Sequence, residues 1–346
     1  MIKAQQKYSG QALLGEELTL SPVDIIIENG HIKAIEENPR APPCWICPAL
    51  FNAHTHLGDT IAMDCGETGD LSALVTPPHG LKHRLLAAAS RNDLVRGMRA
   101  SIEGMISGGV AGCADFREGG TQGVAALKEA ATGLSFSPVI FGRDGGENPA
   151  DGLGISSTRD VQDVERLVKE ARQQGKKIAF HAGERDSSDI DAALSFEPDL
   201  IIHATHATKR QLRQCADNQI PIAVCPRSNW TLGVTASARK PPLRLMQALG
   251  CTLYLGTDNV MFVNPDMFSE IAFASIIYGM DPKTLLRAAI QGSELLRESF
   301  FIHTGARANL FMIDPSQSAL HFSRDPVTSI TKRVSCGHVV HNIFNA

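Results

Sequence analysis

The sequence lacks several features that would assign the chain to a membrane, secreted or nucleic-acid-binding class. No apolar run reaches about 18 residues, the length that a membrane-spanning helix needs. The first residues contain no apolar core of a signal peptide. Basic residues are not in surplus, because 33 Lys and Arg stand against 37 Asp and Glu. We therefore expect a cytoplasmic globular protein whose partner is a small molecule, and neither a nucleic acid nor a membrane.

Clustered cysteines are also missing. The eight cysteines are scattered through 346 residues, as expected of reduced thiols in the cytosol. Only Cys44 and Cys47 have the spacing of a metal or redox pair, and because no second pair accompanies them we interpret them as structural. The length suits one large α/β barrel with an appendage, or two ordinary domains.

Short apolar segments alternate with amphipathic ones from residue 48 onward. The former predict strands, and apolar residues spaced three to four apart predict helices. The predicted strands comprise residues 45–56, 109–116, 138–142, 152–156, 178–181, 200–203, 220–225 and 253–258. The predicted helices comprise residues 85–107, 123–131, 161–174, 211–219, 265–278, 282–291 and 293–300. This pattern predicts an α/β fold, most simply a (β/α)8 TIM barrel over residues 48–305, with no helix between its third and fourth strands.

The two ends of the chain predict strands without intervening helices. At the N-terminus these are residues 11–20, 23–28 and 32–35, and Asn29-Gly30 is a hairpin signal. The tail contributes residues 309–314 and 334–344. We expect residues 1–47 and 306–346 to pair as one small, composite β-sandwich-like domain beside the barrel.

Histidine and acidic residues fall at the ends of the predicted barrel strands, where barrel enzymes place their catalytic groups. His54 and His56 project from one face of the first strand, and His181, His203 and Asp258 end three later strands. Imidazole and carboxylate donors together suit Zn²⁺, with Fe²⁺ as an alternative. We therefore expect one divalent metal ion and a metal-activated water.

Four motifs in order resemble those of the amidohydrolase superfamily. They are His54-Thr55-His56, His181-Ala182-Gly183-Glu184, Ile201-Ile202-His203-Ala204-Thr205-His206 and Gly256-Thr257-Asp258. With Cys225-Pro226-Arg227-Ser228-Asn229, they are most similar to the branch that holds cytosine deaminase, the chlorohydrolases and the S-adenosylhomocysteine and adenosine-type deaminases.

The resemblance implies specific roles for these residues. It implies His54, His56, His181 and Asp258 as metal ligands, with Asp258 also accepting a proton. Glu184 would be the proton shuttle and His203 the activating histidine, with His206 as the competing choice. The implied reaction is hydrolytic deamination by metal-bound hydroxide. No lysine at the fourth strand matches the bridging ligand of dinuclear members, so one metal is expected.

The substrate is the least determined part of this interpretation. A small aminated heterocycle of purine, pyrimidine, nucleoside or pterin type is expected, and an anionic one if Arg117 and Arg143 hold an acidic group. The alternative is that these arginines lock barrel loops by ion pairs with neighbours such as Glu118 or Asp144.

Three further residues are candidate substrate contacts. Lys82 and His83 lie in a loop that follows the first barrel strand, and Asn229 lies in the Cys-Pro-x-Ser-Asn segment. Two other functions stay open: hydrolysis of a ring C–N amide or C–Cl bond, and a non-catalytic ligand-binding barrel. The apolar stretch 268–278 leaves open a homo-oligomer.

Overall fold

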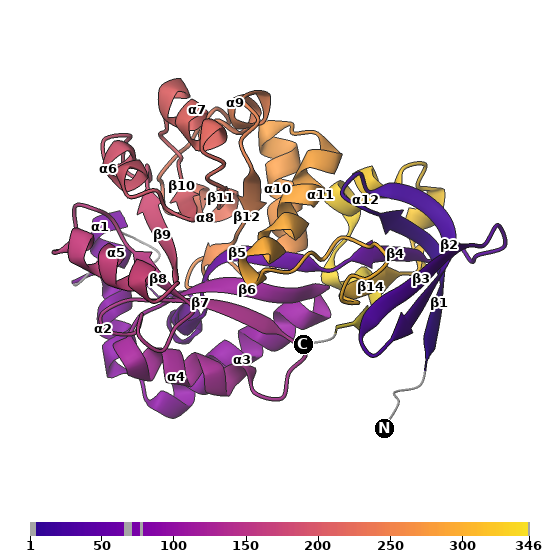
Figure 1. Ribbon diagram of the computed structural model, residues 1–346, viewed down its shortest axis with the longest axis horizontal. Coiled ribbons are helices and arrows are strands. Elements are labelled where there is room, and N and C mark those ends of the chain that lie inside the picture. Colours follow the sequence, from indigo (N-terminus) through magenta and orange to yellow (C-terminus); the bar gives the residue numbers. More distant parts are fainter. Residues whose placement is uncertain (1–4, 66–70, 77–78, 345–346) are drawn as a thin grey trace.

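The computed structural model describes residues 5–65, 71–76 and 79–344, and their strands form two sheets (Figure 1). One sheet has nine strands and the other has six. Pro77 and Pro78 of the predicted covering loop lie outside the described residues. Within the described part of the chain, no helix is both long and apolar enough to cross a membrane.

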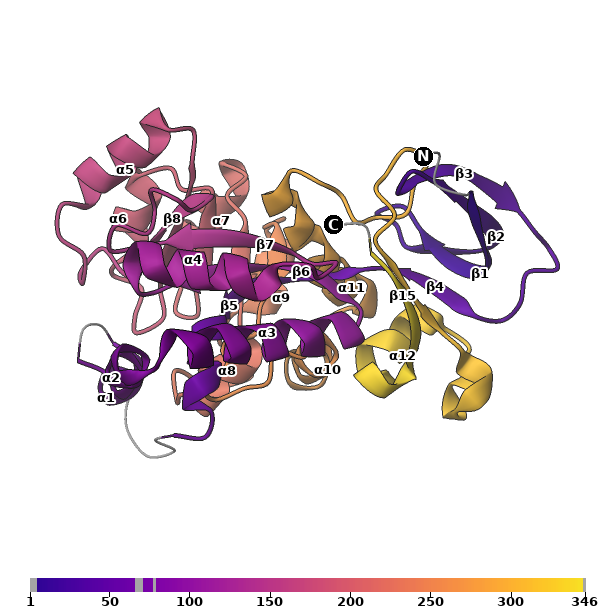
Figure 2. The same ribbon diagram turned by 90° about the horizontal axis from the view of Figure 1, so that it is seen from below.

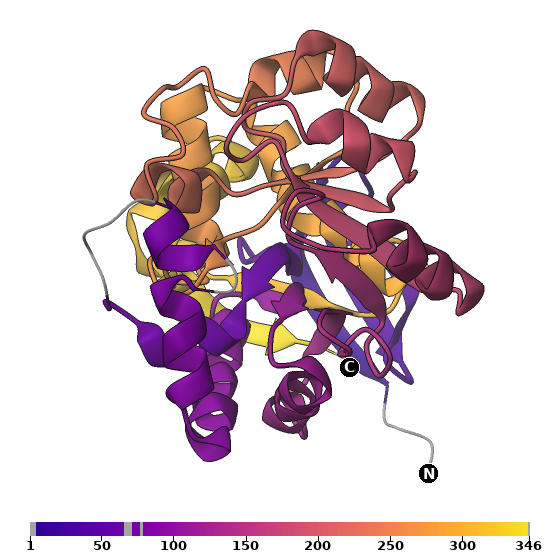
Figure 3. The same cartoon turned by 90° about the vertical axis from the view of Figure 1, so that its left-hand side faces the viewer.

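The nine-stranded sheet is parallel throughout and carries the strands expected from the sequence. Its members are β5 (Leu50–His56), β6 (Val110–Arg117), β7 (Ser137–Gly142), β8 (Gly152–Ile155), β9 (Lys177–Ala182), β10 (Leu200–His203), β11 (Ile222–Val224), β12 (Leu253–Leu255) and β13 (Asp258–Asn259). They follow the order β12-β11-β10-β9-β8-β7-β6-β5-β13. The sheet is curled, with helices around its outside (Figure 3). The predicted α/β architecture with a parallel sheet is therefore confirmed.

Helices connect most of these strands. They are α1 (Leu71–Val75), α2 (Leu81–Ala88), α3 (Arg91–Ser107), α4 (Gly120–Ala131), α5 (Val164–Gln173), α6 (Ile190–Ser195), α7 (Lys209–Asp217), α8 (Pro226–Thr231), α9 (Leu243–Ala248), α10 (Met267–Tyr278) and α11 (Pro282–Gln291), with 3₁₀ segments at Leu57–Ala62 and Gly292–Leu296. As expected, residues 143–151, all of them described, contain no helix between β7 and β8. The single helix predicted over 85–107 is two, because Ser90 caps α3 by accepting a hydrogen bond from Asp93 N.

The six-stranded sheet combines both ends of the chain and lies at one end of the molecule (Figure 2). It contains β1 (Gln6–Leu14), β2 (Thr19–Glu28), β3 (His31–Glu37), β4 (Trp45–Pro48), β14 (Leu310–Ile313) and β15 (Val339–Ile343). Asn29 and Gly30 both have positive φ, 52° and 79°, which is the backbone that a two-residue hairpin turn requires. The division of the chain into two domains at these boundaries stays a prediction.

One local expectation was wrong. The apolar run 45–56 is not one strand: β4 belongs to the six-stranded sheet, and the chain crosses to β5 at Ala49. There Ala49 N donates to Asn309 O, whereas Leu50 N donates to Gly109 O. Both halves are buried, so periodicity could not separate them. The tail also forms α12 (Pro326–Arg333), for which the sequence pattern predicted no element, and this helix packs against α10 and α11.

Candidate metal centre

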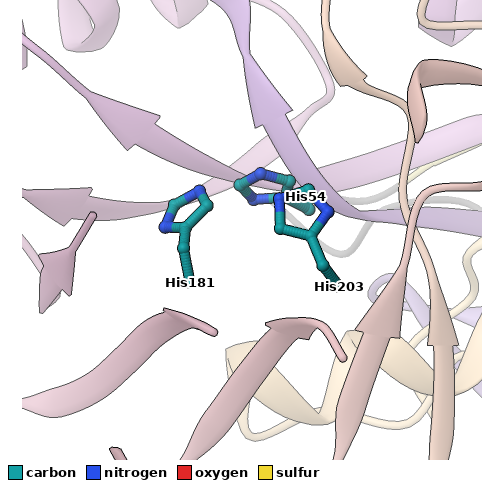
Figure 4. A group of neighbouring side chains, drawn as sticks. All are labelled: His54, His181 and His203. Carbon is teal, nitrogen blue, oxygen red and sulfur yellow. The ribbon is translucent and has the colours of Figure 1, made fainter. Parts of the chain in front are cut away.

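Four histidines gather at the carboxyl ends of three strands. His54 and His56 come from β5, His181 from β9 and His203 from β10. Figure 4 shows His181 and His203 directed from neighbouring strands toward His54. The ring centroid of His54 lies 4.8 Å from that of His181 and 5.7 Å from that of His203. Asp258 completes the group, with Oδ1 3.1 Å from His54 Nε2 and 3.4 Å from His56 Nε2.

The backbone at these strand ends is unusual. His203 and Asp258 have φ of 75° and 62°, in the left-handed region that side chains with a Cβ rarely adopt. Gly256 lets the last strand approach β5 closely, because a Cβ there would lie 2.6 Å from His54 N. Such strain is typical of functional sites, where the surrounding structure compensates for it.

The protonation states of these groups suit a divalent metal. Burial lowers the pKa of His54 to about 4 and that of His56 to about 3, and it lowers the pKa of His181 well below its usual value. The rings are therefore neutral at pH 7 and can act as ligands. Burial acts to raise the pKa of Asp258, but the neighbouring imidazoles outweigh it and hold that pKa well below its usual value.

Unpartnered nitrogen atoms provide the test of whether a metal fits. Nδ1 of buried His54 and Nδ1 of His203 have no hydrogen-bond partner among the described residues, and His54 Nε2 faces Asp258 Oδ1 at 3.1 Å without the geometry of a hydrogen bond. Ligand atoms of His54, His56 and Asp258 lie within 4.8 Å of one another, as do those of His54, His181 and His203. Unpaired buried polar atoms are costly, so this convergence is best explained by a cation that the site binds.

Residues outside the ligand set orient it. His56 Nδ1 lies 3.0 Å from Glu118 Oε1 and 3.1 Å from Phe116 O, which leaves Nε2 for a metal. His181 Nδ1 lies 3.0 Å from Ile155 O. Ser228 Oγ donates to Asp258 Oδ2 at 2.7 Å. The sequence pattern did not single out Ser228, although it lies in the Cys-Pro-x-Ser-Asn segment, and it treated Glu118 only as a possible ion-pair partner.

Glu184 and His203 face each other beside the ligands, with Glu184 Oε1 3.7 Å from His203 Nε2. The side chain of Glu184 is 22% exposed, so it reaches both the site and its opening. Burial raises the pKa of Glu184, and the nearby charge of Asp258 adds to the increase while His203 opposes it. His206 lies elsewhere, with Nδ1 2.8 Å from Lys240 Nζ, and does not line the cavity at the ligands.

A cavity of about 60 Å³ opens directly onto these groups. It is lined by His181, Glu184, His203 and Asp258 on one side, and by residues of the covering segments on the other. A larger pocket of about 690 Å³ adjoins it, and the two share the lining residues His83, Arg143, Ser156 and Asp160. The neighbouring space is large enough for the rest of a small organic molecule.

Comparisons with known proteins agree with the geometry. A family model described as "Adenosine deaminase" matches residues 151–310. A putative aminohydrolase of Methanothermobacter thermautotrophicus is 32% identical over 97% of this chain and 96% of its own length. The chain belongs to the amidohydrolase superfamily. The family resemblance inferred from the four motifs is thus confirmed, and the protein is a hydrolase that acts on carbon–nitrogen bonds.

Other amidohydrolases are similar over most of their length. A 5-methylthioadenosine/S-adenosylhomocysteine deaminase of Halobacterium salinarum is 24% identical over 97% of this chain and 90% of its own. The solved structure of an adenosine deaminase from Xanthomonas campestris with bound zinc superposes with a TM-score of 0.81 at 17% identity. It covers 97% of this chain and 90% of that one, and this likeness concerns the fold.

Three of the five expected substrate contacts line the cavity of this amidohydrolase, namely Lys82, His83 and Arg143. Arg143 has buried Nε and Nη2 atoms without a hydrogen-bond partner among the described residues, and its Nη1 lies 3.8 Å from Glu118 Oε1. His83 Nε2 lies 3.1 Å from Val75 O. Lys82 lines the cavity but is held in ion pairs.

The other two, Arg117 and Asn229, do not line this cavity. Arg117 is buried, with Nη2 2.8 Å from Glu118 Oε2 and Nη1 3.3 Å from Asp115 Oδ1. Its guanidinium fills the space above Gly58, where any side chain would collide with it. Asn229 is buried and donates to Thr205 Oγ1 at 2.9 Å. The ion-pair alternative considered for the arginines thus describes the contacts of Arg117, and the substrate contacts stay a prediction for Arg143.

Proposed function

We propose that this amidohydrolase is a mononuclear zinc-dependent deaminase of a small aminated heterocycle. The observation that carries the proposal is the convergence of neutral imidazoles and ionised Asp258 on one cavity that also receives Glu184. The relatives named as deaminases of purine compounds support a purine-like ring, and the zinc in a solved structure of the same fold supports zinc. We assign His54, His56, His181 and Asp258 as ligands.

The reaction replaces an exocyclic amine by oxygen. Water adds to the ring carbon that bears the amine, one of its protons passes to the ring nitrogen and the other to the departing amine, and ammonia leaves. A divalent cation in this site would lower the pKa of a coordinated water from about 15.7 toward about 7.

The protein's own groups move the protons. Glu184 accepts a proton from the water and returns it to the substrate, which suits a carboxyl whose pKa is raised by burial. His203 donates a hydrogen bond to the charge that develops as water adds. Asp258, held by Ser228 from one side, accepts the second proton and passes it to the departing amine, which leaves as ammonia.

We also propose that the parallel strands form a closed (β/α)8 barrel over residues 48–305. The support is the pairing of the last segment, because β12 is registered against β11 while β13, two residues further on, is registered against β5. Thr257 N donates to His54 O between them. In this proposal β12 and β13 are two halves of one barrel strand, and residues 1–47 with 306–346 form the accessory domain.

Ammonia release tests the reaction. Metal-analysed protein would be assayed against aminated purines, pyrimidines, nucleosides and pterins, each with an acidic derivative where one exists. We expect release from at least one ring and one metal ion per chain. Preference for acidic members, lost in Arg143→Met, would support the anion-holding role of Arg143.

Two other results would each assign a different function to the protein. Turnover of an amide or chlorinated ring without ammonia from any amine would assign a different hydrolytic bond. Protein that binds no metal and releases no product would assign a non-catalytic binding barrel.

A further inference from the structure

A chain of buried ionic contacts leads from helix α2 to one of the candidate metal ligands. Lys82 Nζ of α2 lies 2.8 Å from Asp59 Oδ2 and 2.9 Å from Glu118 Oε1. All three side chains are buried. The same Glu118 oxygen lies 3.0 Å from His56 Nδ1. A lysine that touches no ligand is therefore one contact removed from the metal centre.

Asp115 of β6 and Glu118, which follows that strand, contact His56 and its chain neighbours. Asp115 Oδ2 accepts from Leu57 N at 2.6 Å and from Thr55 Oγ1 at 3.1 Å, so it holds both chain neighbours of His56. Glu118 holds the ring itself and is held in turn by Arg117 through its other oxygen. The orientation of His56 therefore depends on where the Glu118 carboxylate is fixed.

Lys82 supplies the cation that fixes the oxygen facing His56. Burial acts to lower the pKa of Lys82, but Asp59 and Glu118 outweigh it and raise that pKa, so the amine stays charged. When a buried carboxylate oxygen loses the cation that pairs with it, the carboxylate turns toward another donor. Another cation near this oxygen is Arg143, whose Nη1 is 3.8 Å away, and a turn of the carboxylate toward it would move Glu118 relative to His56.

We propose that Lys82 is a positioning residue for the metal centre: by fixing Glu118 it holds His56 in the orientation that binds the metal. The inference rests on the metal site of the proposed function, but not on the identity of the substrate. A single side chain, Glu118, thus lies between Lys82 of helix α2 and the proposed ligand His56. Partners that orient a metal-binding histidine typically contribute 10- to 100-fold to metal affinity.

The test is the zinc dissociation constant, measured by competition with a chromophoric chelator and without any substrate. We compare the wild type, Lys82→Met, Glu118→Gln and the double variant. Lys7→Met is the matched control, because Lys7 makes a similar ion pair with Asp24 far from the site. We expect about 10- to 100-fold weaker zinc binding for Lys82→Met, no further loss in the double variant beyond Glu118→Gln, and no change for Lys7→Met.

Wild-type zinc affinity in folded Lys82→Met would overturn the proposal, and a raised KM in that variant would make Lys82 a substrate contact instead. Losses that simply add in the double variant would also overturn it, because Lys82 would then not act through Glu118. Thermal unfolding of the metal-free variants checks that each is folded. Should Lys82→Met not fold, Asp59→Asn/Lys82→Met removes the buried pair together, and its zinc affinity decides the question in the same way.

Discussion

Two nearly identical lysine–aspartate pairs lie in different surroundings, one in the six-stranded sheet and the other between helix α2 and the 3₁₀ segment beside the metal centre. Lys7 Nζ lies 2.7 Å from Asp24 Oδ2 in the six-stranded sheet, where the side chains are 57% and 10% exposed. Lys82 Nζ lies 2.8 Å from Asp59 Oδ2 beside the metal centre, where they are 3% and 0% exposed. The Nζ–Oδ2 distances are nearly the same, so the difference in burial determines how much each ion pair affects the protein.

Water and salt screen the first pair, and the strands of its sheet are held by backbone pairing without it. The second pair belongs to a buried network whose members also hold a histidine and the backbone next to it. Breaking a buried pair leaves a charge that must rearrange, and here the rearrangement occurs beside the catalytic groups. The comparison therefore predicts that substitutions around the metal centre change metal binding and turnover strongly. Substitutions around Lys7 and Asp24 should change them little.

The largest difference is expected between His181, a proposed metal ligand, and His206, which does not line the cavity at the metal centre. His181→Ala removes a proposed ligand and should abolish zinc retention and ammonia release together. His206→Ala removes a half-buried ring that contacts Lys240 and Val234 O, and should change both by less than about tenfold. Metal analysis after dialysis and steady-state kinetics measure both; a metal-free His181→Ala that still turns over would contradict the ligand assignment.

Removal of the proposed shuttle carboxylate, Glu184, comes next. Glu184→Gln should lower kcat by roughly 10²- to 10⁴-fold while zinc stays bound, because general acid–base catalysis contributes about that much. Since burial raises the pKa of Glu184, the wild-type rate should fall with decreasing pH at a value above the usual 4.5 for a glutamate. The pH profile of kcat/KM shows this limb; an unchanged kcat in Glu184→Gln would assign proton transfer to another group.

Two serines allow a second comparison between the metal centre and the six-stranded sheet. Ser228 donates to Asp258 at the metal centre, and Ser9 donates to Asp24 in the six-stranded sheet. Ser228→Ala should weaken zinc binding about 10- to 100-fold, since it frees a ligating carboxylate. Ser9→Ala should leave the zinc dissociation constant unchanged. Equal effects of the two substitutions would show that Ser228 does not orient Asp258.

The smallest effect is expected at Asp24 itself. Lys7, Ser9 and Asn38 lower the pKa of Asp24 from 3.8 to about 2. A lowered folded-state pKa contributes stability above pH 3.8, and that contribution is lost as the pH falls through about 2. Thermal unfolding of wild type and Asp24→Asn should therefore differ slightly at neutral pH and converge in acid. A difference that does not depend on pH would show that the carboxylate charge is not involved.

Much of the fold could be predicted from local patterns. Alternating apolar and amphipathic segments predicted the parallel strands and most helices, including the missing helix between β7 and β8. The division of 45–56 between two sheets was missed because both halves are apolar and buried, so the pattern is continuous across the crossing. Helix α12 was missed because its partners, α10 and α11, are distant in sequence.

The candidate site, like the fold, could be predicted from the sequence only in part. The gathering of His54, His56, His181, His203 and Asp258 could be predicted, because each lies at or near the carboxyl end of a strand predicted from the sequence and parallel strands end at one edge. The positions of the arginines were not predictable individually. Arg117 and Arg143 both follow a strand, yet only Arg143 lines the cavity.

Residue identity and strand order were enough to indicate the donor groups proposed as metal ligands and the family to which the chain belongs. Which charged residues support that site became evident only once the packing of the chain was known. Lys82, Asp59 and Glu118 lie on different elements, and nothing in their local sequence marks them as partners. Burial and the match of opposite charges join them, and both arise only when the chain is packed.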